Sequence, residues 1–275
     1  WSFDLERLQW SAEAPIPQAT PRAIAVNGAP GEVLVYGGTT WEEAETDALF
    51  SWSLGDGSWD QLESEGPEPR YKHAAAWDGE QLWVMGGRNN DGDEPVVYDA
   101  LWSRASDGQW SLHESAASPG PLFRQGMAWD SGNHRLWVYG GIDADGERSD
   151  ALYSFEPESE TWTLYSPEGA RPLQKASHSL VWSDGALVAW GGHATDTSSW
   201  RYDIATNTWT ERAESPSPLP RDAQVTALSK NGETLYIMGG DNFEGEGNDF
   251  LSDVWAMDVV TGAWTQLKET GYGEP

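Results

Sequence analysis

Acidic side chains in three loops have the spacing of cation ligands. Asp143, Asp145 and Glu147 alternate along a turn that contains Gly146. Calcium takes six to eight oxygens from compact, flexible segments of this kind, although none of the three loops has the twelve-residue EF-hand pattern. We therefore expect calcium as a candidate cofactor, with a metal-free acidic turn as the alternative. The candidate ligands are Asp91, Asp93, Asp143, Asp145, Glu147 and Asp241.

Catalytic patterns are sparse in this chain. The absence of cysteine excludes thiol nucleophiles and zinc–thiolate sites. His73 and His178 both stand thirteen residues before a Gly-Gly pair, and this equivalence favours histidines packed between repeated units over catalytic bases. We find no Ser-His-Asp motif, phosphate loop or zinc helix. A pair of carboxylates suited to glycoside hydrolysis would depend on a separation in space that the sequence does not give. We leave the question of an enzyme open and favour a protein without catalysis.

These side chains are carried by a sequence that repeats. Five apolar runs end in Gly-Gly, and the successive pairs are 49, 54, 51 and 48 residues apart. A polar loop and an aromatic residue follow each pair, and a tryptophan comes eight or nine residues after the aromatic. Turn residues separate these segments, so each unit predicts four short antiparallel strands, a to d. The tryptophans are Trp59, Trp110, Trp162, Trp209 and Trp264.

A unit of about 50 residues with Gly-Gly after its second strand and tryptophan in its fourth resembles the kelch repeat. The resemblance covers nearly the whole chain and implies an all-β fold, a kelch-type β-propeller. Paired glycines would let neighbouring backbones approach closely, and the indoles would fill the space between blades. We expect a c–d half blade at 1–12 and full units at 21–63, 69–113, 121–165, 172–212 and 220–267.

The ends of the chain bear on the number of blades. Trp1 and Trp10 have the same nine-residue interval as Phe50 and Trp59, so the chain opens inside a further unit. Six units would need about 28 residues more than the 275 present, which is close to one a–b strand pair. We therefore expect a six-bladed propeller that lacks one half blade and belongs to a longer polypeptide. A five-bladed ring is the alternative.

The resemblance places the b-to-c and d-to-a loops on one face of the ring. The b-to-c loops hold 18 of the 45 acidic residues. We expect a negative rim that attracts a basic partner, with acid that only maintains solubility as the alternative. These loops are 39–49, 88–99, 142–150, 193–200 and 241–253.

Basic residues stand where the a strands begin. In kelch domains that bind acidic peptides, arginines in this neighbourhood line the pocket, and the resemblance extends that role to Arg22, Arg70, Arg124 and Arg221. The alternative is that these arginines pair with carboxylates between blades. We expect a non-enzymatic module that binds a protein or peptide. A carbohydrate-binding or metal-dependent carbohydrate-active domain is the rival function.

The amino-acid composition disfavours two classes of partner, nucleic acids and membranes. Against 45 acidic residues stand only 16 lysines and arginines, and the net charge of −29 disfavours nucleic acid. The longest apolar runs are far too short for membrane insertion. Exposed strand edges would favour assembly with another segment that completes the propeller. An acidic, tryptophan-rich, cysteine-free chain suits a secreted bacterial protein, so we expect an extracellular or cell-surface location.

Overall fold

The computed structural model describes residues 1–18, 20–42, 44–63, 65–90, 92, 94–192, 196–212, 216–242 and 249–269. Secondary structure within these ranges consists of strands, turns and bends, without helices. No helix that could cross a membrane is found in this part of the chain.

Five sheets of four antiparallel strands make up most of the fold, and within each sheet the strands follow one another in sequence order. The first sheet contains β3 (Ile24–Asn27), β4 (Glu32–Tyr36), β5 (Leu49–Ser53) and β6 (Trp59–Leu62). The second contains β7 (Ala74–Trp77), β8 (Leu82–Met85), β11 (Leu101–Arg104) and β12 (Trp110–His113). The third contains β13 (Gly126–Asp130), β14 (Arg135–Tyr139), β15 (Leu152–Glu156) and β16 (Thr161–Tyr165).

The two remaining four-stranded sheets repeat the pattern. The fourth contains β17 (Ser179–Ser183), β18 (Ala186–Trp190), β19 (Ser199–Asp203) and β20 (Thr208–Arg212). The fifth contains β21 (Val225–Leu228), β22 (Thr234–Met238), β25 (Val254–Asp258) and β26 (Trp264–Lys268). Two of the b-to-c loops each contain a pair of two-residue strands. These are β9 (Arg88–Asn89) with β10 (Val96–Val97), and β23 (Asp241–Asn242) with β24 (Asp249–Phe250).

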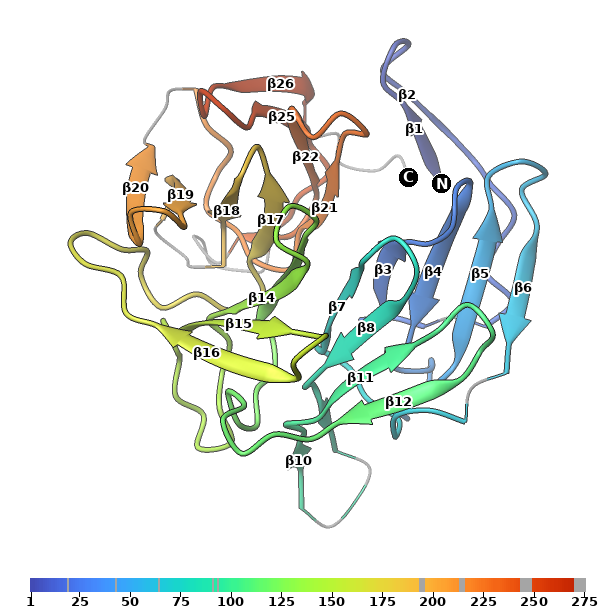
Figure 1. The fold of residues 1–275 in the computed structure, drawn as a ribbon. Coiled ribbons are helices and arrows are strands. Elements are labelled where there is room, and N and C mark those ends of the chain that lie inside the picture. The colour runs from blue at the N-terminus through green and yellow to red at the C-terminus, as the bar shows by residue number, and fades with distance from the viewer. Residues whose placement is uncertain are drawn as a thin grey trace.

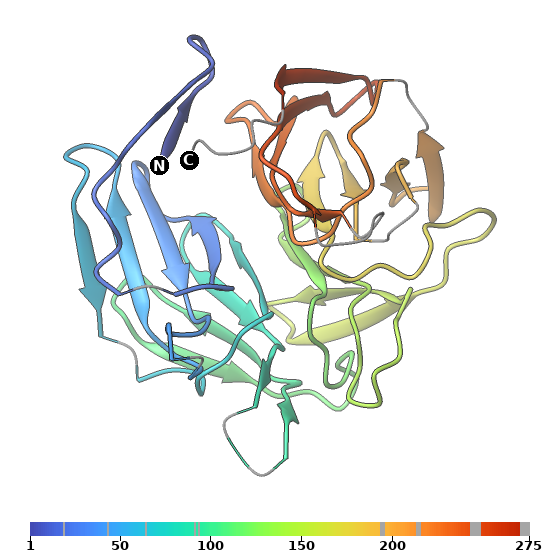
Figure 2. The ribbon, with the colours of Figure 1, turned by 180° about the vertical axis from the view of Figure 1, so that it is seen from behind.

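The five sheets are arranged as blades around a common axis (Figures 1 and 2). The first strands of successive blades contact one another along the series β3, β7, β13, β17 and β21, so these strands are the innermost. The kelch-type β-propeller is therefore confirmed. Five complete blades correspond to the five-bladed alternative, and the six-bladed expectation is not what the described residues show.

The segment that was expected to be the c–d half blade of a sixth unit, residues 1–12, is a two-stranded hairpin. Strands β1 (Ser2–Asp4) and β2 (Gln9–Ser11) pair with each other and with no other described strand. Both ribbon views place the hairpin between the first and the fifth blades (Figures 1 and 2). The segment that follows it is tied to the first blade, because the indole N–H of Trp59 donates to the carbonyl of Ala14 over 2.9 Å.

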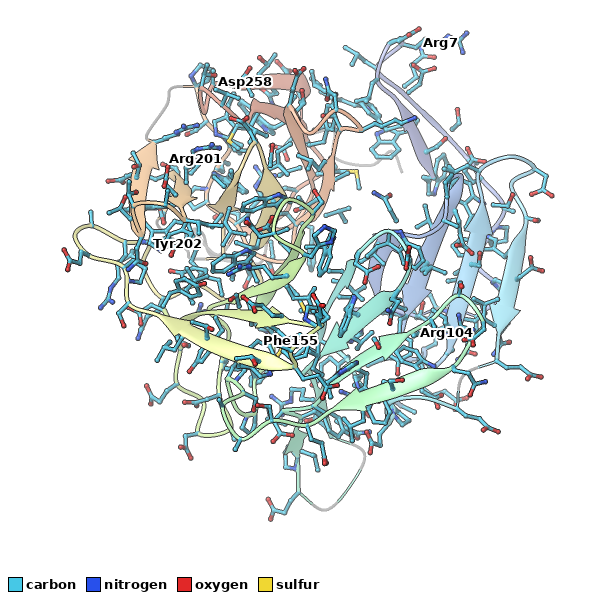
Figure 3. All side chains as sticks on the ribbon, viewed as in Figure 1. Arg7, Arg104, Phe155, Arg201, Tyr202 and Asp258 are labelled. Atoms are coloured by element: carbon cyan, nitrogen blue, oxygen red, sulfur yellow. The ribbon has the colours of Figure 1, made fainter. Side chains whose placement is uncertain are left out.

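Aromatic side chains fill the space between blades. Tyr139 of the third blade lies 5.1 Å from Trp209 of the fourth, centroid to centroid, and Trp190 of the fourth lies 5.2 Å from Trp264 of the fifth. Phe155 is fully buried beside Trp83 of the preceding blade (Figure 3). Each large ring removes much apolar surface from water, which offsets the modest aliphatic content of the chain.

The paired glycines bring neighbouring blades into hydrogen-bond contact. The N–H of the second glycine donates to a carbonyl at the start of the next blade, as from Gly141 to Lys175 over 2.8 Å and from Gly192 to Arg221 over 2.8 Å. Gly141 has a positive φ of 98°, and a Cβ there would meet the Cβ of Gln125 at 2.9 Å. A side chain would therefore push the start of β13 away from the end of β14 in the same blade.

Candidate functional site

Five residues with left-handed backbone form a ring around the axis, just before the innermost strands, and we call them the axial ring. Their φ angles lie between 54° and 63°. The N–H of Arg124 donates to the carbonyl of Lys72 over 2.8 Å, that of Ser177 to Arg124 over 2.8 Å, and that of Ala223 to Ser177 over 3.0 Å. These bonds link the second to the fifth blades at the level where their innermost strands begin. The axial ring consists of Arg22, Lys72, Arg124, Ser177 and Ala223.

The first three positions of the axial ring are cationic, and Arg88 from the adjacent b-to-c loop joins them. The ring of Tyr71 lies among these groups, with Lys72 Nζ at 5.0 Å, Arg22 Cζ at 5.6 Å and Arg88 Cζ at 6.0 Å from its centroid. Tyr71 is buried and exchanges two backbone hydrogen bonds of 3.0 Å with Arg88. An aromatic face attracts cations, so Tyr71 helps to hold them together. We call Arg22, Lys72, Arg88 and Arg124 the cationic cluster.

The cationic cluster carries a surplus of positive charge within an acidic protein. Burial, and then the charges of Arg124, Arg22 and Arg88, lower the pKa of Lys72 to about 8. Asp222 is the described carboxylate that pairs with the cluster, at 3.8 Å from Arg124. Burial raises the pKa of Asp222 against the opposing effect of Arg124. One carboxylate cannot balance four cations, so the cluster is suited to bind an anion.

Three other cationic side chains lie inside the blades and donate hydrogen bonds to carbonyl groups there. Arg70 donates to the carbonyl of Gly86 over 3.0 Å and pairs with Glu68 at 2.9 Å. Lys175 and Arg221 make the same kind of contact with the first glycine of their own blades, and they pair with Asp196 and Asp253. All three side chains are fully buried. Their arrangement is that of structural ion pairs.

The four arginines expected to line a pocket therefore divide into two groups. Arg22 is exposed and Arg124 half-buried, and both belong to the axial ring. Arg70 and Arg221 are only 0% and 1% exposed and cannot reach a ligand on the loop face without leaving their partners. Lys72 and Arg88 complete the cluster and were not among the expected ligands. The sequence analysis missed which position faces the axis, because the axial residue lies two residues after the buried cation, as Lys72 follows Arg70 and Ala223 follows Arg221.

His73 and His178 lie between blades, as their equivalent positions predicted. Both are buried, and each ring meets the edge of a tyrosine of the preceding blade, Tyr36 at 5.3 Å and Tyr139 at 5.5 Å. Burial lowers the pKa of each histidine to about 3, with Arg70 and Lys175 acting in the same direction. The two rings are therefore neutral parts of the packing between blades.

The acidic turn at Asp143 is held by its own backbone. One carboxylate oxygen of Asp143 accepts hydrogen bonds from the N–H groups of Asp145 at 3.0 Å and Glu147 at 2.9 Å. Asp241 is in β23, and Asp91 and Asp93 lie outside the described residues. No group of three or more His, Asp or Glu side chains in the described ranges could hold a metal ion. Calcium binding remains a prediction, which melting with and without calcium would test.

One contact has the order of a catalytic triad. Ser103 Oγ lies 2.9 Å from His113 Nε2, and His113 Nδ1 lies 3.2 Å from Glu160 of the next blade. Ser103 is only 3% exposed. In the third blade the equivalent strands place Ser154 in the same contact with the Tyr165 hydroxyl. The recurrence of the contact with a tyrosine indicates a link between strands rather than a nucleophile and its base. No motif indicated this contact, because its residues come from separate strands and blades.

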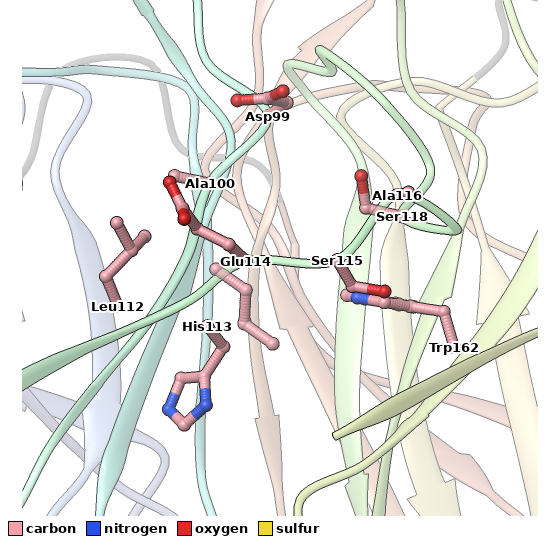
Figure 4. A pocket seen from close by; sticks show the side chains of 10 residues that line it. Asp99, Ala100, Leu112, His113, Glu114, Ser115, Ala116, Ser118 and Trp162 are labelled. Atoms are coloured by element: carbon pink, nitrogen blue, oxygen red, sulfur yellow. The ribbon is translucent and has the colours of Figure 1, made fainter.

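A cavity of about 340 Å³ lies beside this contact, between the second and third blades (Figure 4). Its lining includes Asp99, Glu114, His113 and Trp162 but not Ser103. A substrate in this cavity would not touch the serine hydroxyl, and this agrees with a structural role for Ser103.

Comparisons with known proteins agree with this architecture. A family model described as the KLHDC2/KLHL20/DRC7 Kelch-repeats domain matches residues 91–275. Acyl-CoA-binding domain-containing protein 4 of Arabidopsis thaliana is 25% identical over 90% of this chain and 41% of its own length. Rab9 effector protein with kelch motifs of Rattus norvegicus is 27% identical over 60% of this chain and 45% of its own length. Host cell factor of Drosophila melanogaster is 22% identical over 82% of this chain and 18% of its own length. The chain thus spans less than half the length of these relatives.

Proposed function

Because the chain belongs to the family of KLHDC2/KLHL20/DRC7 kelch-repeat domains, we propose that it is a protein-binding module that recognises its partner on the loop face of the ring. Relatives named as a Rab9 effector and as a host cell factor support a role in protein interaction. Hydrogen-bonded blades hold the loops on a rigid frame, so binding would order few additional residues and would lose little conformational entropy.

The cationic cluster is the observation that carries this proposal. Within the described ranges, Asp222 is the carboxylate that pairs with Arg22, Lys72, Arg88 and Arg124, so an acidic group of the partner would add negative charge to this cluster. Guanidinium groups bind carboxylates through two parallel hydrogen bonds, and a half-buried site strengthens such contacts relative to water. We infer that the partner presents an aspartate or glutamate to the axis of the ring.

Loop residues around the cluster would contact the flanks of that partner segment. Glu42, Glu94, Asp145 and Glu147 are exposed on the b-to-c loops and support the proposal of a negative rim that favours basic flanking residues. Apolar contact would come from the same loops, because Trp41 is 81% exposed there. The proposed partner segment therefore has an acidic centre with basic and aromatic neighbours.

Paired synthetic peptides test the proposal. A fluorescein-labelled set with one central Asp or Glu and basic flanks is compared with the same set carrying Asn or Gln, and fluorescence anisotropy reports binding. We expect the acidic peptides to bind more tightly, with an affinity that falls as salt is raised. Arg124→Gln should weaken that binding about tenfold or more, consistent with loss of a charge-assisted contact.

The matched control is Lys230→Gln, at an exposed turn far along the chain from the cluster. It changes the net charge by the same amount without touching the axis. Equal binding of acidic and amide peptides, or equal losses in the two variants, would contradict the proposed site.

Two further expectations also stand as proposals. The β1–β2 hairpin has free edges in the described structure, which supports assembly with another segment, and light scattering of the purified chain tests this.

An extracellular or cell-surface location is the second proposal, and fractionation of cells that produce the protein tests it.

A further inference from the structure

We propose that Lys72 is a carbamylation site, where the side-chain amine combines with carbon dioxide and the resulting carbamate is held by Arg22, Arg88 and Arg124. This modification does not depend on the proposed protein partner. Its regulatory consequence, described below, does rest on the proposed function.

The position of Lys72 brings cations close to its amine, and Asp222 is the described carboxylate that opposes their effect on its pKa. Lys72, Arg22 and Arg88 approach one aromatic ring, that of Tyr71, at 5.0, 5.6 and 6.0 Å. The carbonyl of Lys72 accepts the N–H of Arg124, so the fourth member of the cluster is fixed next to it. Among the described ion pairs none includes Lys72, because Asp222 is paired with Arg124 instead. A negative group on the amine would therefore find guanidinium groups around it.

Carbon dioxide reacts only with a neutral amine, and the same surroundings supply one. With its pKa lowered to about 8, Lys72 is neutral in about a tenth of the molecules at pH 7. An ordinary lysine, with a pKa about 2.4 units higher, is neutral several hundredfold less often. The guanidinium charges that disfavour the ammonium would favour the carbamate, because they attract a negative charge as strongly as they repel a positive one.

The reaction is balanced without any further reagent. The nitrogen lone pair forms a bond to the carbon of carbon dioxide, and the electrons of one carbon–oxygen π bond move onto oxygen. One proton leaves the nitrogen for solvent. Relative to the ammonium form, the charge at position 72 changes from positive to negative. The two carbamate oxygens have the planar geometry that guanidinium groups bind in pairs.

The charge reversal would regulate the proposed binding site. A carbamate would occupy the guanidinium groups that an acidic partner needs, so carbon dioxide would compete with that partner. This step follows only if the partner binds at the cationic cluster.

Trapping with triethyloxonium ion tests the modification on the intact protein. The chain is equilibrated with ¹³C-labelled bicarbonate, the carbamate is alkylated, and labelled peptides are located by mass spectrometry. We expect label at Lys72 to exceed that at exposed Lys230 by at least about tenfold, because of the larger neutral fraction at Lys72. Equal labelling of the two lysines, or none at Lys72, would overturn the proposal.

Two variants separate the role of the cluster from a change in folding. Arg22→Gln alters an exposed side chain and should reduce the label at Lys72 while the melting temperature stays within a degree or two of the parent. Lys72→Arg keeps the positive charge and should abolish the label. Unchanged labelling in Arg22→Gln would show that the cluster does not hold the carbamate. No partner is present in these assays, so their failure would leave the proposed protein binding untouched.

Discussion

The backbone N–H of Arg124 donates to the carbonyl of Lys72 over 2.8 Å, although the two residues belong to different blades. Both have left-handed backbone, with φ of 61° and 55°. Ser177 makes the same bond to Arg124 and Ala223 to Ser177, so four of the five axial residues are linked from blade to blade. The cationic cluster is consequently a property of the assembled ring and not of a single repeat.

Loss of a buried ion pair should destabilise the fifth blade. Arg221→Met would leave the carboxylate of Asp253 buried opposite an apolar side chain, whereas it now pairs with Arg221 at 2.9 Å and accepts the Trp255 indole N–H at 2.8 Å. We expect the free energy of unfolding in urea to fall by about 3–5 kcal/mol. The control Arg201→Gln removes the partly exposed pair with Asp184 and should cost about 1 kcal/mol or less. Equal costs would contradict the structural role assigned to Arg221.

Two glycine substitutions should separate backbone strain from close packing between two segments of one blade. Gly141→Ala and Gly146→Ala both place alanine at a positive φ, 98° and 86°. Only at Gly141 would the added Cβ meet a neighbouring segment, Phe123 and Gln125 at the start of the innermost strand of the same blade, because nothing lies within 4 Å of it at Gly146. We expect about 1–2 kcal/mol of strain in each and about 1–3 kcal/mol more in Gly141→Ala. Chemical denaturation measures the difference, and similar values for both would contradict the close approach.

Acid should destabilise the protein through its buried histidines. The pKa of His73 and of His178 is about 3 in the folded chain, whereas an unperturbed histidine has a pKa of 6.5. The unfolded chain therefore binds these protons more readily. Stability is therefore retained above about pH 6.5 and lost as pH falls toward 3, by up to about 1.4 kcal/mol per pH unit for each histidine.

The repeat itself supplies the substitution that tests this pH dependence. Gln125 and Gln224 occupy the equivalent positions and donate to carbonyls of the preceding blades. We expect His73→Gln with His178→Gln to fold and to flatten the decline of stability between pH 6.5 and 4. His134→Gln, at an exposed turn, should leave the decline unchanged. A decline that persists in the double variant would assign it to other groups.

Buried and exposed tryptophans should have opposite effects on stability and binding. Trp264→Ala removes an indole packed 5.2 Å from Trp190 and should cost about 3–5 kcal/mol of unfolding free energy. Trp41→Ala removes an indole that is 81% exposed and should change stability by about 0.5 kcal/mol or less. If the loop face binds the partner, Trp41→Ala weakens the binding of the acidic peptides in the anisotropy assay. Full binding by Trp41→Ala would exclude that loop from the interface.

Local spacing alone predicted the blades. Gly-Gly, an aromatic and a tryptophan recur in the same order in each unit, because every blade must solve the same packing problem against its neighbour. The indoles of Trp209 and Trp264 lie between blades as that spacing predicted, and His73 lies between the first and second blades at its repeated position. Such features depend on short segments of chain, and a repeated short segment can be identified from its residues.

Tertiary structure decided which of the basic residues meet. Arg70 and Arg221 stand at one position of the repeat and are buried, whereas Lys72 and Arg124 stand two residues further along and reach the axis. The left-handed backbone and the bonds between blades set this difference, and neither is visible in residue types. The contact of Ser103 with His113 and Glu160 joins two blades in the same way. Groups separated by about 50 residues come together only when the ring is assembled, so the sequence determined the blades and the ring determined the site.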